Sequence, residues 1–411
     1  MGRDKRELKN IWLISQHTYS PTMNAGTRHY GMGKELIKNG VELNIFTSSF
    51  NHKKLEETQK YGWFNLYKRE VLDGVNFVWI RSLKYKKNDG ILRLISMFLF
   101  SFTSFFIGLI SRRFGSPDVI MASTPTLVPA FFASILAKVK RKPFLLEIRD
   151  LWPETIVKFH PEKQHHILIK FFYKIEAYCL KRADRIAGLL PGIPNYLDKI
   201  DSTLRDKFFW LPNGVESEIL KDALDARIDV KNVVYAGALS KANAMKSIID
   251  TADLLKNNGL EFHIYGNGME KGELIALTEK RNLNHVYFHD PVPKKNIFSV
   301  LAKADILIAS LKDTDLYEYG ISLNKIYDYM AIGKPVVFGV KAFNDPISEA
   351  GAGISVSPEN PQEMAAAIVD ISKMSVEQRN TMAKRGRDYI SRGHTFEILG
   401  NKLLNELRQL T

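Results

Sequence analysis

Short apolar runs, rich in β-branched and aromatic residues, alternate with amphipathic stretches along almost the whole chain, and this alternation predicts βα units built on parallel sheets. The expected strands are 10–15, 42–47, 75–80, 118–122, 143–148 and 185–189, followed by 232–236, 261–265, 286–289, 305–309, 335–338 and 353–356. A turn at Leu211-Pro212-Asn213-Gly214 separates the two series. Because 411 residues exceed the size at which one hydrophobic core keeps growing, the pattern indicates an α/β protein with two domains.

The expected domains are residues 1–210 and residues 211–375, with a further helical segment over 376–411. From Met364 onward the pattern is helical almost to the end of the chain, and no further strand is expected there. These helices would cap the second domain, and a return of the last helix to the first domain is left open.

The basic residues are concentrated in the first half of the chain. Residues 1–200 hold 32 Lys and Arg against 17 Asp and Glu, a net charge of +15, whereas residues 201–411 hold 26 against 28, a net charge of −2. The asymmetry indicates that the first half faces an anionic partner, such as a membrane leaflet, a lipid diphosphate or nucleic acid. Nucleic acid is not expected, because no recognition module or paired aromatic platform accompanies the charge.

Cysteine usage and the start of the chain both favour a cytoplasmic protein. The single cysteine, Cys179, excludes an internal disulfide framework and any site with several thiolate ligands, and we interpret it as a buried apolar thiol. The charged start is followed by only four apolar residues, 11–14, which is too short a run for the core of a signal peptide.

The most apolar stretch covers residues 94–110, which are 17 residues without a charge. Its length lies at the lower edge for a bilayer span, and Ser96, Ser101, Thr103, Ser104 and Gly108 dilute it. A buried or half-buried helix of the first domain is the favoured interpretation. A helix lying in the membrane interface is the main alternative, supported by the cluster of Phe residues and by nearby Lys, and a true span is the third.

Three segments combine a strand end, small residues and a helix start, which is the arrangement that binds anions through free backbone amides and the helix dipole. The first contains Gly237, Lys241 and Asn243, where the lysine could neutralise a diphosphate; the alternative is an ordinary βα turn. The second contains Gly266 and Gly268, which would let a backbone approach a ligand or merely form a tight turn.

The third segment covers residues 319–335. Its loop enters a helix near Leu323, and Gly333 with Pro335 ends that helix before the next strand. Asp328 falls near the second turn of the helix and could bind ribose hydroxyls, while the loop amides face a diphosphate. The residues expected to contact the donor here are Gly320, Ser322, Leu323, Asn324, Lys325 and Asp328.

This third segment resembles the donor-binding signature of family 4 glycosyltransferases of GT-B fold, in the subgroup that builds bacterial O-antigen and capsule chains. Those enzymes usually place two acids eight positions apart, the second beginning an acid-x-Met-Ala-x-Gly-x-Pro pattern. Asp328 matches the second acid, whereas Gly320 stands where the first would fall. The chain resembles the members that have Gly-x-Ser-x-Asn-Lys in this loop.

The resemblance extends over nearly the whole chain. Residues 16–29 are similar to the family's glycine-bearing first loop, with Gly26 and Arg28 facing the interdomain cleft. Residues 147–154, Glu-Ile-Arg-Asp-Leu-Trp-Pro-Glu, are close to a subgroup motif, and Arg149 stands where many relatives carry a cleft histidine. Residues 290–293 resemble the loop that meets the nucleotide base, which adds Val292 to the donor site.

The resemblance implies a GT-B fold of two Rossmann-like domains, with an acceptor on the first and a nucleotide-diphospho-sugar on the second. It implies a retaining, metal-independent hexosyltransferase without a cofactor, acting in O-antigen or capsule synthesis, and a UDP-linked donor with an N-acetylated amino sugar as one candidate. Lys241 would stabilise the departing nucleoside diphosphate, and Asp150 and Arg149 would position the sugar or the acceptor. Together with the basic first half, it suggests a polyprenyl-diphosphate-linked sugar as acceptor and peripheral association with the cytoplasmic face of the inner membrane.

Other functions were weighed against this one. The histidines of the first half, among them His17, His29 and His166, lack the paired spacing of a metal site. A nucleotide-sugar 2-epimerase of the same fold and a catalytically silent membrane-surface scaffold remain as alternatives.

Overall fold

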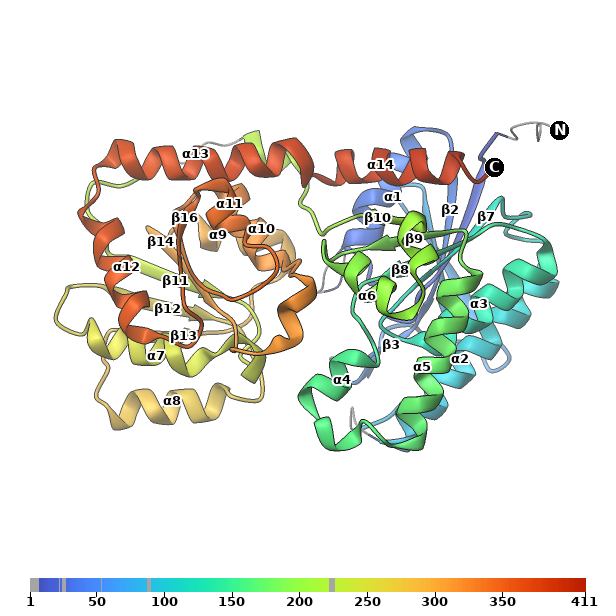
Figure 1. Ribbon diagram of the computed structural model, residues 1–411, viewed down its shortest axis with the longest axis horizontal. Coiled ribbons are helices and arrows are strands. Elements are labelled where there is room, and N and C mark those ends of the chain that lie inside the picture. Colours follow the sequence, from blue (N-terminus) through green and yellow to red (C-terminus); the bar gives the residue numbers. More distant parts are fainter. Residues whose placement is uncertain (1–6, 22, 24–26, 53, 87–89, 222–225) are drawn as a thin grey trace. The chain divides into compact units, whose positions relative to one another are not determined.

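The computed structural model describes residues 7–21, 23, 27–52, 54–86, 90–221 and 226–411, and its contacts divide the chain into two compact units. Unit 1 comprises Met1–Pro212 with Leu399–Thr411, and unit 2 comprises Asn213–Ile398. Each unit is a sheet covered by helices on both faces (Figure 1).

Unit 1 is built on an eight-stranded sheet in the order β10-β9-β8-β7-β1-β2-β6-β5, parallel except for the β5–β6 pair. Its strands are β1 (Asn10–Ile14), β2 (Glu42–Ser48), β5 (Tyr67–Leu72), β6 (Val75–Ile80), β7 (Val119–Ser123), β8 (Phe144–Ile148), β9 (Arg185–Gly188) and β10 (Phe208–Trp210). A separate two-residue ladder joins β3 (Phe50–Asn51) and β4 (Glu56–Glu57).

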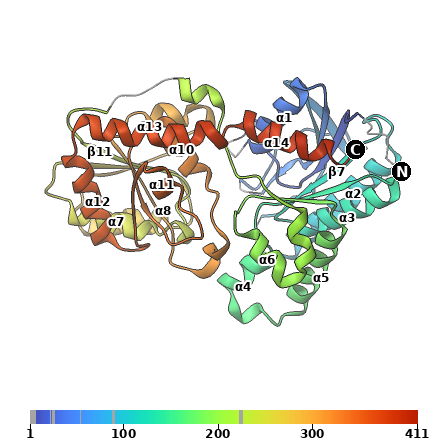
Figure 2. The ribbon, with the colours of Figure 1, turned by 45° about the horizontal axis from the view of Figure 1, so that its top comes forward.

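The helices of unit 1 are α1 (Arg28–Lys38), α2 (Ile91–Ile110), α3 (Leu127–Lys140), α4 (Glu154–Phe159), α5 (Ile167–Arg182) and α6 (Ile193–Ile200). The C-terminal helix α14 (Phe396–Arg408) contributes its residues from Leu399 onward to unit 1. Helix α3 contacts both α2 and α5, and Figure 2 shows these three helices together in one layer on the sheet.

Unit 2 has a six-stranded, fully parallel sheet in the order β13-β12-β11-β14-β15-β16. Its strands are β11 (Asn232–Ala236), β12 (Glu261–Tyr265), β13 (Val286–His289), β14 (Ile306–Ser310), β15 (Val336–Gly339) and β16 (Gly353–Val356). The helices are α7 (Met245–Leu254), α8 (Lys271–Lys280), α9 (Ile297–Leu301), α10 (Asn324–Ile332), α11 (Pro346–Ala350), α12 (Pro361–Lys373) and α13 (Val376–Gly393).

Two apolar clusters form the core of unit 2, one on each face of its sheet. One joins the strands to residues of α7, α8 and α12, and the other joins them to α9, α10, α11 and α13. This sandwich fixes α10, whose residues from Ile326 to Ile332 are buried. The helix that carries Asp328 is therefore held rigidly against the strand ends.

The sequence predicted the twelve strands of both parallel series within one residue at each end, and two strands of the first sheet were missed. Strand β5 is polar and half exposed, and it pairs with β6 through Asp73 and Gly74, which both have positive φ. Asp-Gly between two strands is a recognised hairpin signal, so this strand could have been found. Strand β10 has only three residues and lies at the other edge of the sheet.

Candidate functional site

In unit 2, the loops that follow β11 and β12 are bound directly to each other. Gly237 N donates to Tyr265 O at 3.0 Å, and Leu239 N donates to Asn267 O at 2.9 Å. A Cβ atom on Gly266 would lie 1.9 Å from Gly237 O, and one on Gly268 would lie 2.0 Å from Leu239 O. The close approach of the two loops thus accounts for both glycines without a ligand, and it fixes the backbone at Gly237.

Lys325 connects the start of α10 to the loop after β11. Its Nζ donates to Asn243 Oδ1 at 2.7 Å and to Tyr235 Oη at 2.9 Å, and it lies 4.7 Å from the centre of the Tyr235 ring. Burial lowers the pKa of Lys325 to about 7. A Cβ atom on Gly237 would lie 3.1 Å from this Nζ. The fold therefore brings Gly237, Asn243 and Lys325 together at the C-terminal end of β11.

Lys241 lies beside this cluster. It begins the short 3₁₀ helix Lys241–Asn243, and its side chain is exposed. The turn after β11 therefore holds the half-buried ammonium of Lys325 through Asn243 and also carries the solvated ammonium of Lys241.

The loop before α10 is held by side chains from outside the signature. Ser322 Oγ accepts from Asn213 N at 2.8 Å, and Asn213 Nδ2 donates to Ser322 O at 2.6 Å. Gly320 has φ +106° and ψ −177°, a conformation that side-chain-bearing residues rarely adopt. The position where relatives carry an acid is therefore one where this loop requires glycine.

Helix α10 begins at Asn324, whose side chain is exposed, and Leu323 precedes it in an extended conformation. Within the described part of the chain, no side chain caps this helix start. Its first amides therefore remain available to an anion, which is where the sequence predicted the diphosphate.

Asp328 is buried in α10 and paired with Lys294, whose Nζ lies 2.6 Å from Oδ1. Burial raises the pKa of the Asp328 carboxyl, and Lys294 opposes that shift. Lys294 follows Val292 in the loop after β13. No sequence pattern points to this lysine, because no spacing rule connects it with Asp328 across 34 positions.

In unit 1, Arg28 belongs to a buried network around Glu147. Glu147 is fully buried and accepts from Arg28 Nε at 2.9 Å, His29 Nε2 at 2.6 Å and Ser123 Oγ at 2.5 Å. Burial alone would raise the pKa of Glu147, but His29 and Arg28 hold it well below its usual value. Arg28 also donates to the carbonyls of Leu211 and Pro212, so its guanidinium is fully engaged within the unit.

Arg149 and Asp150 follow β8, as the sequence placed them. Arg149 N donates to Thr124 Oγ1 at 2.9 Å, and its side-chain Nε is buried and has no hydrogen-bond partner among the described residues. Asp150 accepts from Thr155 Oγ1 at 2.7 Å, and burial raises its pKa. Gly26, expected nearby in the first loop, lies outside the described residues.

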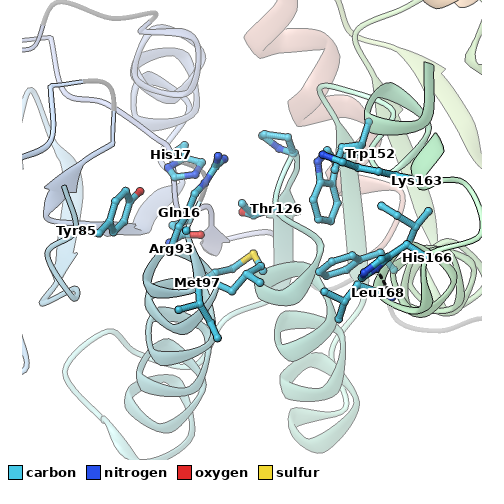
Figure 3. A pocket seen from close by; sticks show the side chains of 17 residues that line it. Gln16, His17, Tyr85, Arg93, Met97, Thr126, Trp152, Lys163, His166 and Leu168 are labelled. Atoms are coloured by element: carbon cyan, nitrogen blue, oxygen red, sulfur yellow. Dashed lines mark hydrogen bonds between the residues drawn. The ribbon is translucent and has the colours of Figure 1, made fainter. Parts of the chain in front are cut away.

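A cavity of about 640 Å³ opens in unit 1 between α2 and α5 (Figure 3). Arg93 and Met97 reach it from α2, Gln16 and Thr126 from the loops after β1 and β7, Lys163 and His166 from the segment before α5, and Leu168 from α5 itself. The sequence analysis did not predict this cavity, because its lining residues are spread from position 16 to position 172.

Helix α2 packs on this unit with its small residues inward. Its buried residues include Ser96, Ser101, Ser104 and Gly108, and a Cβ atom on Gly108 would lie 2.6 Å from Leu136 of α3. Met97, Phe100 and Ile107 are buried with them, whereas nine other large apolar residues of α2 are exposed: Ile91, Leu92, Ile95, Phe98, Leu99, Phe102, Phe106, Leu109 and Ile110. The favoured interpretation of a half-buried helix matches this packing, although α2 is also long and apolar enough to cross a membrane by length and composition alone.

The part of the chain that the structure describes holds no group of three or more His, Cys, Asp or Glu residues that could bind a metal ion. Lys325, at the start of α10, and Lys241, in the turn after β11, bring two cationic groups to this part of unit 2.

Residues 230–373 match the family model described as glycosyl transferases group 1. The chain is 24% identical over 421 residues to a putative colanic acid biosynthesis glycosyl transferase, WcaI, of Escherichia coli K12, covering 96% of this chain and 99% of the relative. It is 25% identical over 183 residues to a putative colanic acid biosynthesis glycosyltransferase, WcaL, of Salmonella typhimurium, covering 43% and 45%.

Solved structures share the fold at low identity. Sucrose-phosphate synthase from Thermosynechococcus elongatus superimposes with a TM-score of 0.74 at 16% identity, covering 98% of this chain and 99% of that one. Anabaena Alr3699/HepE in complex with UDP and glucose gives a TM-score of 0.65 at 14% identity, covering 98% and 100%. The two-sheet α/β architecture expected from the sequence is thereby confirmed.

Proposed function

Because the chain is a glycosyltransferase of GT-B fold that resembles the family 4 enzymes of bacterial polysaccharide synthesis, we propose that it transfers a sugar from a UDP-linked donor to a lipid-linked saccharide. The product would be a bacterial surface polysaccharide such as an O-antigen or a capsule. The names of two relatives, which refer to colanic acid biosynthesis, support the product class. The UDP in the Alr3699/HepE structures supports the donor.

The cluster of Gly237, Asn243 and Lys325 beside the start of α10 is the observation that carries the donor assignment. A nucleoside diphosphate that leaves the sugar gains negative charge, and preorganised amides and ammonium groups stabilise it where that charge develops. Lys325 and the exposed Lys241 supply two such ammonium groups. We therefore propose metal-independent transfer, in which these two lysines and the α10 amides neutralise the leaving diphosphate.

Asp328 would bind the ribose of the donor. Its carboxylate has about four lone-pair sites, so an ion pair with Lys294 leaves acceptor capacity for hydroxyl groups. Burial raises the pKa of Asp328, and Lys294 opposes that shift and so favours the charged carboxylate. The pair would therefore provide a fixed acceptor for ribose.

On the acceptor side, Arg149 and Asp150 would position the reacting hydroxyl. The buried, unpartnered Nε of Arg149 requires an acceptor, and a sugar oxygen offers one. The raised pKa of Asp150 suits a group that exchanges a proton with a hydroxyl. Retention of configuration would follow from attack on the face that the diphosphate leaves, without an assigned protein nucleophile.

The lipid-linked acceptor is supported by the outer face of unit 1. Helix α2 exposes nine large apolar side chains, whereas the outer face of a helix that faces water is polar. Residues 1–200 carry the net charge of +15, which attracts anionic lipid. We propose that unit 1 binds peripherally to the cytoplasmic face of the inner membrane.

The test is a donor screen by mass spectrometry with lipid-linked acceptor extracted from cells. Transfer of one sugar from a UDP-linked donor, lost in Lys241→Ala and Asp328→Ala, is the expected result. Formation of an epimer from the donor alone would identify a 2-epimerase instead. No measurable binding of UDP or GDP would identify a catalytically silent scaffold.

A further inference from the structure

We propose that the cavity between α2 and α5 binds the diphosphate and the first isoprene units of the acceptor lipid. This assignment rests on the proposed function for the identity of the lipid. It goes further in giving the lipid a defined binding site in unit 1.

The inner walls of the cavity are apolar. Met97 of α2 and Ile169 and Phe172 of α5 are buried, and Leu94 of α2 and Leu168 of α5 add less buried apolar side chains. A cavity of about 640 Å³ is within the range of sites that hold small molecules, about 300–1,000 Å³. These walls offer dispersion contacts and a dry surface to a hydrocarbon chain.

The rim of the cavity is basic. Arg93 comes from α2 and Lys163 from the segment before α5, so a guanidinium and an ammonium flank the cavity from two sides, and His166 adds an imidazole (Figure 3). Ammonium and guanidinium groups around an apolar floor match a ligand with a diphosphate head and an isoprenoid tail.

Gln16 gives the inner end of the cavity its polar character. It lies just beyond β1, is 5% exposed, and its Oε1 has no hydrogen-bond partner among the described residues. A buried carbonyl oxygen without a donor is costly, and a sugar hydroxyl would satisfy it. The cavity thus offers an acceptor for the sugar, cations for the diphosphate and apolar walls for the chain.

Aromatic side chains in ring contact extend across the three helices of this layer. Ring contacts run from Phe106 through Phe105 on α2 to Phe132 and Phe131 on α3, and on to Tyr178 on α5, with centroid distances of 5.3–5.9 Å. Phe102, Phe106, Phe171 and Tyr178 are exposed. A lipid held in the cavity would therefore leave it next to a surface suited to the acyl region of a leaflet.

The test measures binding of farnesyl diphosphate, at concentrations where it is monomeric, to the full chain by calorimetry without any nucleotide. The variant Leu168→Glu places a carboxylate in the wall of the cavity, and Leu99→Glu places one on the outer face of α2. The two leucines are matched, with exposures of 44% and 46%. The His166 cap of α5 survives the first change, because its donor is the Leu168 backbone amide.

We expect farnesyl diphosphate to bind at least about tenfold more tightly than inorganic pyrophosphate, because its chain buries several methylene groups. Leu168→Glu should weaken its binding by at least about tenfold, and Leu99→Glu by less than about twofold, because only the first buries a charge beside the ligand. Leu168→Gln serves as a second cavity variant with no added charge and should weaken binding in the same direction.

Equal effects of the two Glu variants on farnesyl diphosphate affinity would overturn the assignment. Equal affinities for pyrophosphate and farnesyl diphosphate would also overturn it, because they would indicate a simple phosphate site. A dimer that dissociates in Leu168→Glu by light scattering would show that a second copy of the chain covers the cavity. Since no donor is present, the result is independent of whether sugar transfer is found.

Discussion

The half-buried Lys325 should make donor binding depend on pH above neutrality. Burial lowers its pKa to about 7, so close to half of the free protein carries the neutral amine at pH 7. A bound diphosphate favours the charged form and raises this pKa, so binding of UDP should take up a proton. Affinity should therefore fall as the pH rises through 7, because the neutral amine must first be protonated.

The size of the effect follows from the charged fraction of Lys325. If only the charged form binds the diphosphate, the apparent Kd equals the intrinsic Kd divided by that fraction, which falls from about one half at pH 7 to about one eleventh at pH 8. The apparent Kd should then rise about fivefold over this unit of pH, or roughly 1 kcal/mol. The terminal phosphate of UDP loses its last proton near pH 6, which is about one unit below this range. The ionisation of UDP itself therefore contributes little to the pH dependence of the Kd above about pH 7.

Calorimetric titration with UDP between pH 7 and 8.5, at constant ionic strength, measures this dependence. Lys325→Met should bind UDP more weakly and lose the dependence, whereas Lys241→Ala should bind more weakly and keep it. An apparent Kd that stays constant from pH 7 to pH 8.5 in the unmodified protein would refute the reasoning. A full dependence in Lys325→Met would show that another group titrates.

Three further substitutions test parts of the two units. Asp328→Asn should reduce UDP affinity about tenfold and lower the free energy of unfolding by about 1–2 kcal/mol. The loss is smaller than the roughly 3–5 kcal/mol of a fully buried pair because Lys294 is 31% exposed. Unchanged UDP titration and urea denaturation would contradict the ribose assignment. Gly320→Ala should lower the free energy of unfolding, measured by urea denaturation, by about 1–3 kcal/mol. Gly272→Ala, in α8 with open space around it, should not lower it. Equal effects would disprove the role of the backbone conformation. Glu147→Gln should cost about 3–5 kcal/mol by leaving buried Arg28 without its carboxylate. Folding lowers the pKa of Glu147. Its contribution to the free energy of unfolding is therefore fully present above its unfolded pKa of about 4.3 and is lost as the pH falls through the folded pKa. Equal acid denaturation of Glu147→Gln and the unmodified protein would refute this.

The two parallel sheets could be predicted because their strands are buried on both faces. Such strands are continuous apolar runs, as in 232–236 and 306–310, and each ends at a small or polar residue. The edge strand β5 escaped because its exposed side chains give no such run. Local pattern therefore predicts the apolar strands, including the edge strands β13 and β16, and fails for the polar edge strand β5.

The donor residues could be grouped from sequence, but their contacts could not. Lys325 and Asn243 are 82 positions apart, and only the folded unit joins them. Gly266 and Gly268 were expected to admit a ligand, and the structure explains them by the packing of two loops. Gly320 stands where an acid was expected because its backbone requires glycine, a reason that only dihedral angles reveal.

The apolar stretch over residues 94–110 shows why an average over a segment can mislead. Serines and a glycine lower the mean hydropathy of this stretch, but the structure places Ser96, Ser104 and Gly108 on the inner face of α2. The outer face is therefore more apolar than the segment as a whole. Since a Cβ atom on Gly108 would also lie 3.2 Å from the buried Trp12 ring, removal of α2 from the unit would expose its core. This packing favours a helix that stays on the unit, as the proposed peripheral binding requires, over a helix that crosses a membrane.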